Sequence, residues 1–438
     1  MCLTCGCDAV PSKVERVKEA SHGLRGTIAE DLADDSATFD GANAQLLKFH
    51  GIYQQEDRDK RREARQRGLD RHYQMMVRTR IPGGRVSPEG YLAHDEIADR
   101  WGNRTLRITT RQDFQLHGVL KGDLWASVHA INAALMTTLG GCGDQVRNVM
   151  CCPAPLQDRL RTELRAALPA LVDGLTPTTR AYHEIWVDGE AVAGSGAAAA
   201  RAGQRPAEVD PLYGARYLPR KFKVGLAVEG DNCIDVYSND LGLVAVRGPD
   251  GGLDGFTILV GGGLGRTANK PDTYPAVARP LAHVPTGRLV EAARAVVAVQ
   301  RDFGNRSDRR HARLKYVLAE RGLPWFREQV QSRVAFELDA PRPLRWEPLD
   351  DHLGWHEQGD GRLFYGLFVE NGRVQDAGEL RLKTALRRLV EEHRPVLWMT
   401  PQQNLIVGGL ETARRAAIER LLTDHGVPLT EHVSQTLR

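Results

Sequence analysis

Apolar and polar positions alternate along the segment 107–118, which reads RITTRQDFQLHG. Successive side chains of a strand point to opposite faces, so this spacing predicts one strand with a polar face and an apolar face. The apolar face carries Ile108, Phe114 and Leu116, which a core accepts. The polar face is expected to align six side chains, namely Arg107, Thr109, Arg111, Asp113, Gln115 and His117.

The flanking pattern alternates between strands and amphipathic helices. Residues 72–84 predict a strand that ends in a Pro-Gly-Gly turn, and 91–102 and 123–140 predict helices with one apolar face. Farther along, the patterns at 220–229 and 255–263 indicate strands, and 290–304 indicates a long helix. The small, polar segment 191–211 between them is typical of a flexible insertion. Together these elements favour an α+β protein.

An internal repeat supports a duplicated half-domain. The segment 399–410 (MTPQQNLIVGGL) aligns without gaps on 108–119. The matching positions pair Thr109 with Thr400, Gln112 with Gln403, Asp113 with Asn404, and Gly118 with Gly409. Arg111 and His117 are replaced by Gln402 and Gly408, so only the first copy keeps a basic face. Before the second copy, Asn371-Gly372 between apolar runs predicts a tight hairpin.

Length and composition restrict the class of protein. A chain of 438 residues predicts two or three domains, and 42% hydrophobic with 26% charged residues is ordinary for a globular protein. The net charge of +3 gives no reason to expect nucleic acid as a partner. No apolar run is long enough to span a membrane, and the first residues lack the core of a signal peptide. We therefore expect a cytoplasmic protein without a membrane partner.

Basic side chains recur at the predicted strands and turns. They include Arg78, Arg147 and the run Arg220-Lys221-Phe222-Lys223, in which both lysines are expected to project from one strand face. Such groups are rarely buried unless an anion meets them. Guanidinium groups pair with carboxylates through two hydrogen bonds, and lysine acts as a compact charge. The pattern indicates a polycarboxylate cofactor, a small oxyanion, or both.

Three other motifs favour different chemistry and are weaker. The stretch 260–267 (VGGGLGRT) follows a strand, but Arg266 occupies the third glycine position of a dinucleotide loop. Cys2, Cys5 and Cys7 form CxxCxC without a fourth ligand at a clear spacing, so a terminal segment without a metal is favoured. The adjacent Cys151-Cys152 is interpreted as a pair of small buried side chains.

Eight segments occur in the order typical of one family. They read RITTRQDFQLHG, CGDQVRNVMCCP, RAYHEIWVDG, YLPRKFK, YSNDLG, LVGGGLG, RDFGNRSDRRHARLKY and TPQQNLIVGG. From about residue 40 to about residue 430 the chain resembles the haemoprotein of assimilatory sulfite reductase, in the siroheme-dependent nitrite and sulfite reductase family. The resemblance implies siroheme, an iron tetrapyrrole with many carboxylates, and those carboxylates would bind the basic face of 107–117.

The resemblance also implies the architecture. We expect an α+β fold of two ferredoxin-like half-domains related by a pseudo-two-fold axis, together with an α/β siroheme-binding domain. The expected divisions are a polar lead-in over 1–37, the first half-domain over 38–158, the α/β domain over 159–335 and the second half-domain over 336–438. The second half of the siroheme-binding domain is expected to be missing from this chain.

Site residues follow from the matching positions. Arg78, Arg147, Lys221 and Lys223 fall on the family positions that surround the substrate anion. The positions implied to contact siroheme are Arg107, Thr109, Arg111, Gln115, His117, Arg220, Gly262 and Gly263. Family nitrite reductases usually carry asparagine at the second lysine of RKxK, so Lys223 favours sulfite.

One departure concerns the family's 4Fe–4S cluster, which is bound by four cysteines of a C-terminal segment. No cysteine follows Cys233 in this sequence, so no residue is assigned as a ligand of the cluster or of the siroheme iron. We expect a truncated copy or a remainder on another chain, and little or no turnover by this chain alone.

The expected activity is the six-electron reduction of sulfite to sulfide, with electrons from an NADPH flavoprotein or a ferredoxin. Two alternatives stay open: an assimilatory nitrite reductase, which forms ammonia, and a siroheme-binding fragment without catalysis.

Overall fold

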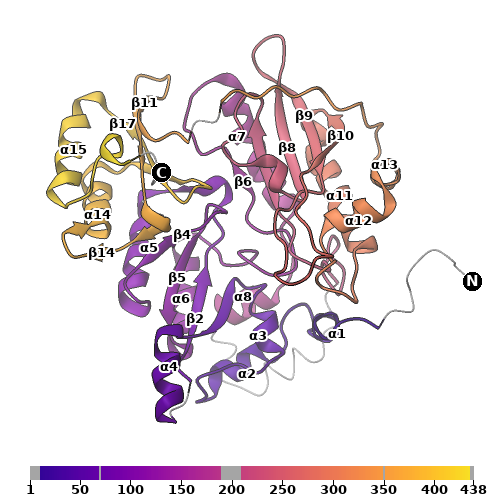
Figure 1. Ribbon diagram of the computed structural model, residues 1–438, viewed down its shortest axis with the longest axis horizontal. Coiled ribbons are helices and arrows are strands. Elements are labelled where there is room, and N and C mark those ends of the chain that lie inside the picture. Colours follow the sequence, from indigo (N-terminus) through magenta and orange to yellow (C-terminus); the bar gives the residue numbers. More distant parts are fainter. Residues whose placement is uncertain (1–9, 69–70, 189–208, 349–350, 435–438) are drawn as a thin grey trace, which may run out of the picture.

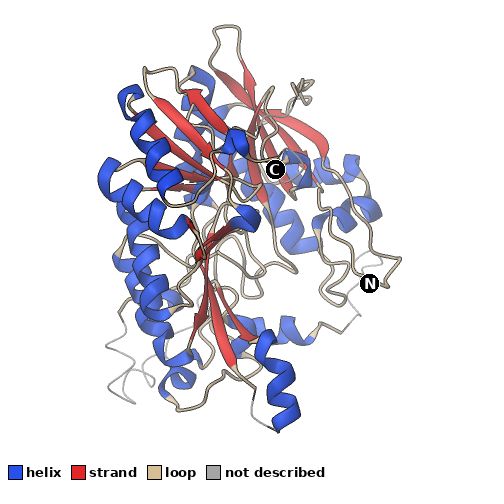
Figure 2. Cartoon of the chain, turned by 60° about the vertical axis from the view of Figure 1, so that its left-hand side comes forward, coloured by secondary structure: helices blue, strands red, loops and turns tan. Residues whose placement is uncertain are grey.

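The computed structural model describes residues 10–68, 71–188, 209–348 and 351–434. Three five-stranded sheets with helices beside them form a mixed α+β architecture, shown in Figure 1. In Figure 2 helices line the left-hand side of the molecule and the strands run beside them. Within the described residues, no helix has the length and apolar character needed to cross a bilayer. Cys2, Cys5, Cys7 and most of the predicted insertion lie outside the described residues.

The first half-domain is built on the sheet β1-β2-β5-β4-β13, with α5 and α6 packed on it. Its elements are β1 (Ile52–Glu56), α4 (Arg58–Arg67), β2 (Tyr73–Arg78), α5 (Pro88–Trp101), β4 (Leu106–Ile108), β5 (Phe114–Val119) and α6 (Lys121–Ala133). Helix α5 begins where the Ser87 hydroxyl accepts a hydrogen bond from Gly90 N at 3.1 Å, with Pro88 in the first turn. Its buried face carries Tyr91, Ile97 and Ala98 at helical spacing.

The second half-domain repeats this plan with the sheet β11-β12-β17-β16-β3. Its elements are β11 (Gly354–Glu357), β12 (Leu363–Leu367), β13 (Arg373–Val374), β14 (Asp376–Ala377), β15 (Leu380–Arg381), α14 (Leu382–His393), β16 (Val396–Met399), β17 (Leu405–Leu410) and α15 (Arg415–Asp424). Helices α5 and α14 contact one another, and Lys383 Nζ lies 3.0 Å from Asp95 Oδ1 and 2.7 Å from Asp99 Oδ1 across that contact.

Each half-domain lends one short strand to the other. Strand β3 (Arg85–Val86) pairs with β16, and β13 pairs with β4. The hairpin predicted at Asn371-Gly372 is therefore wrong, because β13 leaves β12 and joins the other sheet. Both turn residues do adopt positive φ, 53° and 67°, as the sequence required. The exchange of strands ties the two half-domains into one pseudo-symmetric body.

The segment 107–118 is also not one strand, as predicted, but a tight hairpin of β4 and β5. Thr109 N donates to Asp113 O at 2.9 Å, and the Thr109 hydroxyl accepts from Arg111 N and Asp113 N, both at 3.2 Å. Gln112 has φ 58°, which turns the chain back. The Thr109 hydroxyl takes backbone N–H groups that a sheet would otherwise bond, and so it closes a turn. The alternation of polar and apolar residues alone predicts an extended strand here.

The second copy folds identically, which confirms the repeat. Thr400 N donates to Asn404 O at 2.9 Å, and Gln403 has φ 68°. The two turns also hold one another: Gln112 Nε2 donates to Met399 O at 2.9 Å, and Gln403 Nε2 donates to Ile108 O at 2.8 Å. These two bonds occupy equivalent positions of the repeat, as a pseudo-two-fold relation requires.

The third sheet, β10-β9-β8-β7-β6, forms the α/β unit, parallel from β6 to β8 and antiparallel from β8 to β10. Its elements are β6 (Met150–Cys151), α7 (Arg159–Gly174), α8 (Ala181–Trp186), β7 (Val224–Val228), β8 (Leu241–Arg247), β9 (Leu253–Val260), β10 (Arg279–Val284), α11 (Leu289–Phe303), α12 (Leu314–Arg321) and α13 (Leu323–Gln331). Strand β6 precedes residue 159 but belongs to this third sheet, and β13 follows residue 336 but belongs to the first sheet. Strand pairing therefore crosses the predicted domain boundaries, and those boundaries stay a prediction.

The predicted polar lead-in is helical in its described part. It forms α1 (Lys13–Glu19) and α2 (Ile28–Ala33), and α3 (Asn43–Leu46) follows. Lys18 is buried, donates to Leu218 O at 2.7 Å and lies 3.8 Å from Asp144 Oδ2. These contacts attach the lead-in to the loops before β6 and β7.

Candidate functional site

Three neighbouring strands align polar side chains across the first sheet. Arg78 at the end of β2 faces Gln115 on β5, and Gln115 faces Arg107 on β4. With the amide oxygen of Gln115 turned toward Arg78, it accepts from Arg78 Nε at 3.1 Å, and the amide nitrogen contacts His117 Nε2 at 3.3 Å. We call Arg107, Gln115 and His117 the polar row; the structure brings them together with Arg78.

Arg111 does not extend this row, because it lies in the turn. Its guanidinium makes four hydrogen bonds to the α/β unit: Nε and Nη2 donate to Asn148 O at 3.2 and 2.7 Å, Nη2 to Val224 O at 2.7 Å and Nη1 to Asn239 Oδ1 at 2.9 Å. Burial lowers the pKa of Arg111 to about 10. In this structure Arg111 attaches the hairpin turn to β6, β7 and the turn before β8. Thr109 closes the turn itself.

Asp113 is a titratable group that sequence reasoning placed on the polar face but did not assign to the site. Its carboxyl group is buried and accepts from Ile81 N at 3.4 Å. Burial raises the pKa of Asp113 to about 7, although the positive charges of Arg78 and Arg111 oppose the rise. The buried position could not be inferred from alternation, because the chain turns there.

The two lysines of RKFK lie in an extended segment just before β7 rather than in a strand over 220–229. Phe222 between them is buried and its backbone bonds Gln145 O at 3.1 Å and Arg147 N at 2.9 Å. Lys221 and Lys223 therefore share the opposite side of the segment and are half-buried. This placement agrees with the prediction that they project together.

Nearby positive charges act on both lysines. Burial, together with Arg147 and Arg220, lowers the pKa of Lys221 to about 8. Burial, with Arg111 and Arg313, lowers the pKa of Lys223 to about 7. Both groups thus titrate near neutral pH, where a proton donor is most useful.

Arg147 comes close to Arg78 through the loop 142–147. Cys142 Sγ lies 3.8 Å from Arg78 Nη1, and Arg147 Nε donates to Gly143 O at 3.2 Å. We call Arg78, Arg147, Lys221 and Lys223 the cationic cluster. Within the described part of the chain, none of these four has a carboxylate at ion-pairing distance.

The nearby carboxylates already have partners. Asp144 Oδ2 lies 2.7 Å from Arg309 Nη1, and Arg220 reaches Asp144 only at 4.0 Å. Asp240 is buried and holds Arg313 by two hydrogen bonds of 2.8 Å, while it accepts from Lys223 N at 2.8 Å. Sequence reasoning missed Arg313, although it lies in one of the quoted motifs. Among the described residues the cationic cluster therefore has no ion-paired carboxylate, although Asp144 and Asp240 favour the charges of Arg147 and Lys223 from a greater distance.

Gly262 and Gly263 lie where the backbone passes close to its neighbours. A Cβ at residue 262 would stand 2.2 Å from Tyr237 O, and one at residue 263 would stand 2.9 Å from Arg313 Nη2. The Gly263 carbonyl accepts from Lys315 Nζ at 3.0 Å. Close packing of this loop beside Arg313 explains both glycines; contact with a cofactor stays a prediction.

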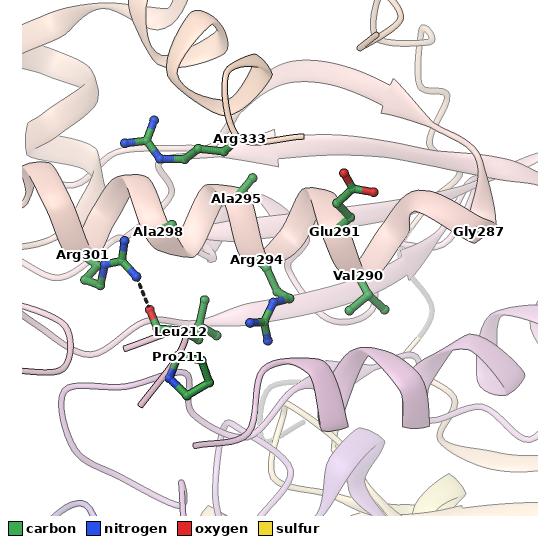
Figure 3. Close-up of a pocket in the computed structure, with 10 residues that line it drawn as sticks. All are labelled: Pro211, Leu212, Gly287, Val290, Glu291, Arg294, Ala295, Ala298, Arg301 and Arg333. Carbon is green, nitrogen blue, oxygen red and sulfur yellow. Dashed lines mark hydrogen bonds between the residues drawn. The ribbon is translucent and has the colours of Figure 1, made fainter. Parts of the chain in front are cut away.

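A pocket of about 540 Å³ lies elsewhere, between α11 and Pro211-Leu212 (Figure 3). Its arginines are occupied: Arg301 Nη1 donates to Leu212 O and Arg294 Nη1 to Gly174 O, both at 2.7 Å. None of its lining residues belongs to the cationic cluster or the polar row. It therefore does not compete with them as the site.

Comparisons with known proteins identify the family to which the fold belongs. Residues 171–338 match the family described as "Nitrite and sulphite reductase 4Fe-4S domain", and residues 67–134 and 356–425 each match "Nitrite/Sulfite reductase ferredoxin-like half domain". The NADPH sulfite reductase hemoprotein beta-component of Shouchella clausii is 42% identical over 432 residues, 98% of this chain and 74% of that relative. The ferredoxin sulfite reductase of Synechococcus elongatus is 43% identical over 435 residues, 98% of this chain and 69% of that relative.

A solved structure, the NirA protein of Mycobacterium tuberculosis, shares the fold with a TM-score of 0.76 and 23% identity. The match covers 97% of this chain and 71% of that one. Two half-domains that exchange short strands, together with the α/β unit, form a scaffold of the nitrite and sulfite reductase type. The chain belongs to the siroheme-dependent nitrite and sulfite reductase family.

The two cofactors of this family fit the described residues differently. Siroheme carries many carboxylates, and a group of cations without carboxylate partners suits it. A 4Fe–4S cluster takes four thiolates. Among the described residues, Cys152 and Cys233 approach one another at 3.4 Å, but the remaining ligands beside them are Asp231 and His352. The described residues therefore do not form a site for the cluster.

We predict that Arg111→Ala and Arg107→Ala have different effects on stability. Loss of Arg111 leaves buried carbonyls without donors, so we expect the free energy of unfolding to fall by roughly 3–5 kcal/mol. Arg107→Ala should cost about 1 kcal/mol or less, since its side chain is half-buried in a polar setting. Urea unfolding measures both, and equal losses would contradict the structural role of Arg111.

Lys223→Met is expected to stabilise the chain at low pH when no anion is bound. The pKa of Lys223 is lowered in the folded chain, so between pH 7 and about 10 the unfolded chain binds more protons than the folded chain. The charged Lys223 side chain therefore destabilises the folded chain most below pH 7, and this destabilisation decreases as the pH rises. We expect the gain at pH 6 to exceed the gain at pH 9 by about 1–2 kcal/mol, after allowance for partial exposure. Urea unfolding at both pH values would refute this if the gains were equal.

Proposed function

We propose that this chain binds siroheme and sulfite and serves the six-electron reduction of sulfite to sulfide in sulfur assimilation. The observation that carries the proposal is the cationic cluster, which brings together side chains from three segments. Arg78 and Arg147 both act on Tyr53, Arg147 acts on Lys221, and Lys221 acts on Lys223. Among the described residues, none of the four has a carboxylate in an ion pair. An anionic cofactor with a small anion beside it would compensate that charge. The names of the relatives, which are sulfite reductases, support the choice of substrate.

In this proposal the cationic cluster binds the substrate and supplies protons. Siroheme, when bound, would supply the redox chemistry that brings electrons to the substrate. Arg78 and Arg147 hold the anionic oxygens by charge-assisted hydrogen bonds. Each departing oxygen needs protons, and Lys221 and Lys223, with pKa values of about 8 and about 7, hold them at neutral pH.

The polar row would receive the carboxylates of siroheme. Arg107, Gln115 and His117 face one way beside Arg78, and Arg220 adds a positive charge beside Lys221. Contacts from Thr109, Arg111, Gly262 and Gly263 to siroheme belong to the same proposal. Thr109 and Arg111 would act mainly by fixing the turn that presents the row.

Electrons would come from a donor protein. One relative is named an NADPH enzyme and the other a ferredoxin enzyme, so an NADPH flavoprotein and a ferredoxin are the two donors to compare. We also propose a cytoplasmic location, which the unbonded state of the four described cysteines supports. That this chain alone turns over little or no sulfite stays a prediction.

A titration of the siroheme-loaded chain tests the proposal. The protein, expressed together with siroheme-synthesising enzymes, should show siroheme absorption that shifts on addition of sulfite. Lys221→Met and Lys223→Met should each weaken sulfite binding about tenfold or more, since each removes a charged hydrogen bond of roughly 1.5–3 kcal/mol. Lys60→Met, which removes an exposed lysine of α4, is the matched control.

Three outcomes would count against the proposal. A chain without siroheme absorption would exclude the cofactor, and unchanged sulfite affinity in both lysine variants would exclude the cationic cluster. Tighter binding of nitrite than of sulfite by the unmodified, siroheme-loaded chain would favour the nitrite reductase.

Anion affinity should also depend on pH. Because the pKa values of Lys221 and Lys223 lie at about 8 and about 7, both lose positive charge between pH 6.5 and pH 9. Nitrite keeps its single charge over this range, so its affinity should fall as the pH rises. The Lys221→Met/Lys223→Met double variant should show a flat profile, and a sloping one would assign the effect to other groups.

A further inference from the structure

A second cluster of ligand-type side chains lies outside the cationic cluster and the polar row. Cys152 follows β6, Asp231 and Cys233 lie in the turn after β7, and His352 precedes β11. Three of the four side chains are buried and Asp231 is half-buried. We call these residues the Cys–Asp–His group.

The ligand atoms of this group converge on one point. All four lie within 4.8 Å of one another. Cys152 Sγ is 3.4 Å from Cys233 Sγ and 3.3 Å from Asp231 Oδ2, and His352 Nε2 is 3.3 Å from the same carboxylate oxygen. Ligands bound to one tetrahedral metal ion at about 2.0–2.3 Å have separations of this size.

The backbone and a neighbouring arginine prepare the group for a cation. Cys233 N donates to Asp231 Oδ1 at 3.0 Å, which turns Oδ2 toward the two sulfur atoms. Arg161 Nη2 lies 3.0 Å from Asp231 Oδ2, and its Nη1 lies 2.9 Å from Asp158 Oδ2. Two thiolates, one carboxylate and a divalent ion sum to a single negative charge, beside the positive charge that Arg161 shares between Asp231 and Asp158.

We propose that the Cys–Asp–His group is a structural zinc site. Two thiolates, an imidazole and a carboxylate form a mixed sulfur, nitrogen and oxygen set that suits Zn²⁺. Four protein ligands fill a tetrahedral shell and leave no open position, so the site would hold structure rather than react. A 4Fe–4S cluster is a poor match, because the group supplies two thiolates and not four.

The zinc ion would fasten the second half-domain to the α/β unit. Cys152, Asp231 and Cys233 belong to the α/β unit, whereas His352 lies in the segment that leads into β11. The turn between β16 and β17 reaches the same place, since Gln402 Nε2 donates to Cys233 O at 2.8 Å. Gln402 occupies the position in the second copy of the repeat that Arg111 occupies in the first. The zinc ion would therefore lie beside the hairpin turn that has glutamine in place of arginine.

Metal analysis of the full chain tests this proposal. Protein purified under reducing conditions and freed of loosely bound ions should contain about one zinc per chain, measured separately from iron. Cys233→Ser and His352→Ala should each lower the zinc content at least fivefold. Cys151→Ser, which removes a buried thiol next to Cys152 but outside the group, should keep it.

X-ray absorption at the zinc edge of the unmodified protein avoids any folding defect of the variants. The expected shell has two sulfur ligands at about 2.3 Å and two nitrogen or oxygen ligands at about 2.0–2.2 Å. Zinc below one tenth of an equivalent, a disulfide between Cys152 and Cys233 in place of metal, or a shell of three or more sulfur atoms would overturn the proposal. So would zinc that persists in Cys233→Ser and is lost only when Cys2, Cys5 and Cys7 are replaced.

Discussion

Positive charge without an ion-paired carboxylate is the constraint on which the rest of this site depends. Arg147 and Lys223 each repel Lys221, and among the described residues no carboxylate forms an ion pair with them or with Arg78. Fixed contacts beside the cluster hold these charges in place despite their repulsion. Asp240 accepts two hydrogen bonds from Arg313, and Arg111 attaches the hairpin turn to β6 and β7. Charge held in place without a protein partner is available to an anionic ligand.

The pseudo-two-fold axis duplicates the scaffold but not the charge. Gln112 and Gln403 hold each other's hairpins, and β3 and β13 cross between the sheets, so neither half-domain completes its sheet alone. On one side the turn presents Arg111, and on the other it presents Gln402, which bonds Cys233 O. One copy thus serves a basic site, while the other lies against the Cys–Asp–His group.

Local patterns in the sequence predicted the elements and the repeat, because hydrophobic periodicity and turn residues are local signals. They failed at 109–113, where the Thr109 hydroxyl closes a turn, and at 371–374, where Arg373 of β13 pairs with Arg107, 266 positions away. The site residues came from resemblance to a family rather than from spacing. Arg313 and the buried Asp113 were not assigned to the site, because their roles rest on contacts between distant segments.

The most direct test is a crystal structure of the siroheme-loaded protein with sulfite at pH 6.5. The sulfite oxygens should lie within hydrogen-bond distance of Arg78, Arg147 and the two lysines, and the siroheme carboxylates should meet Arg107 and Gln115. Sulfite or siroheme bound away from these side chains would contradict the account.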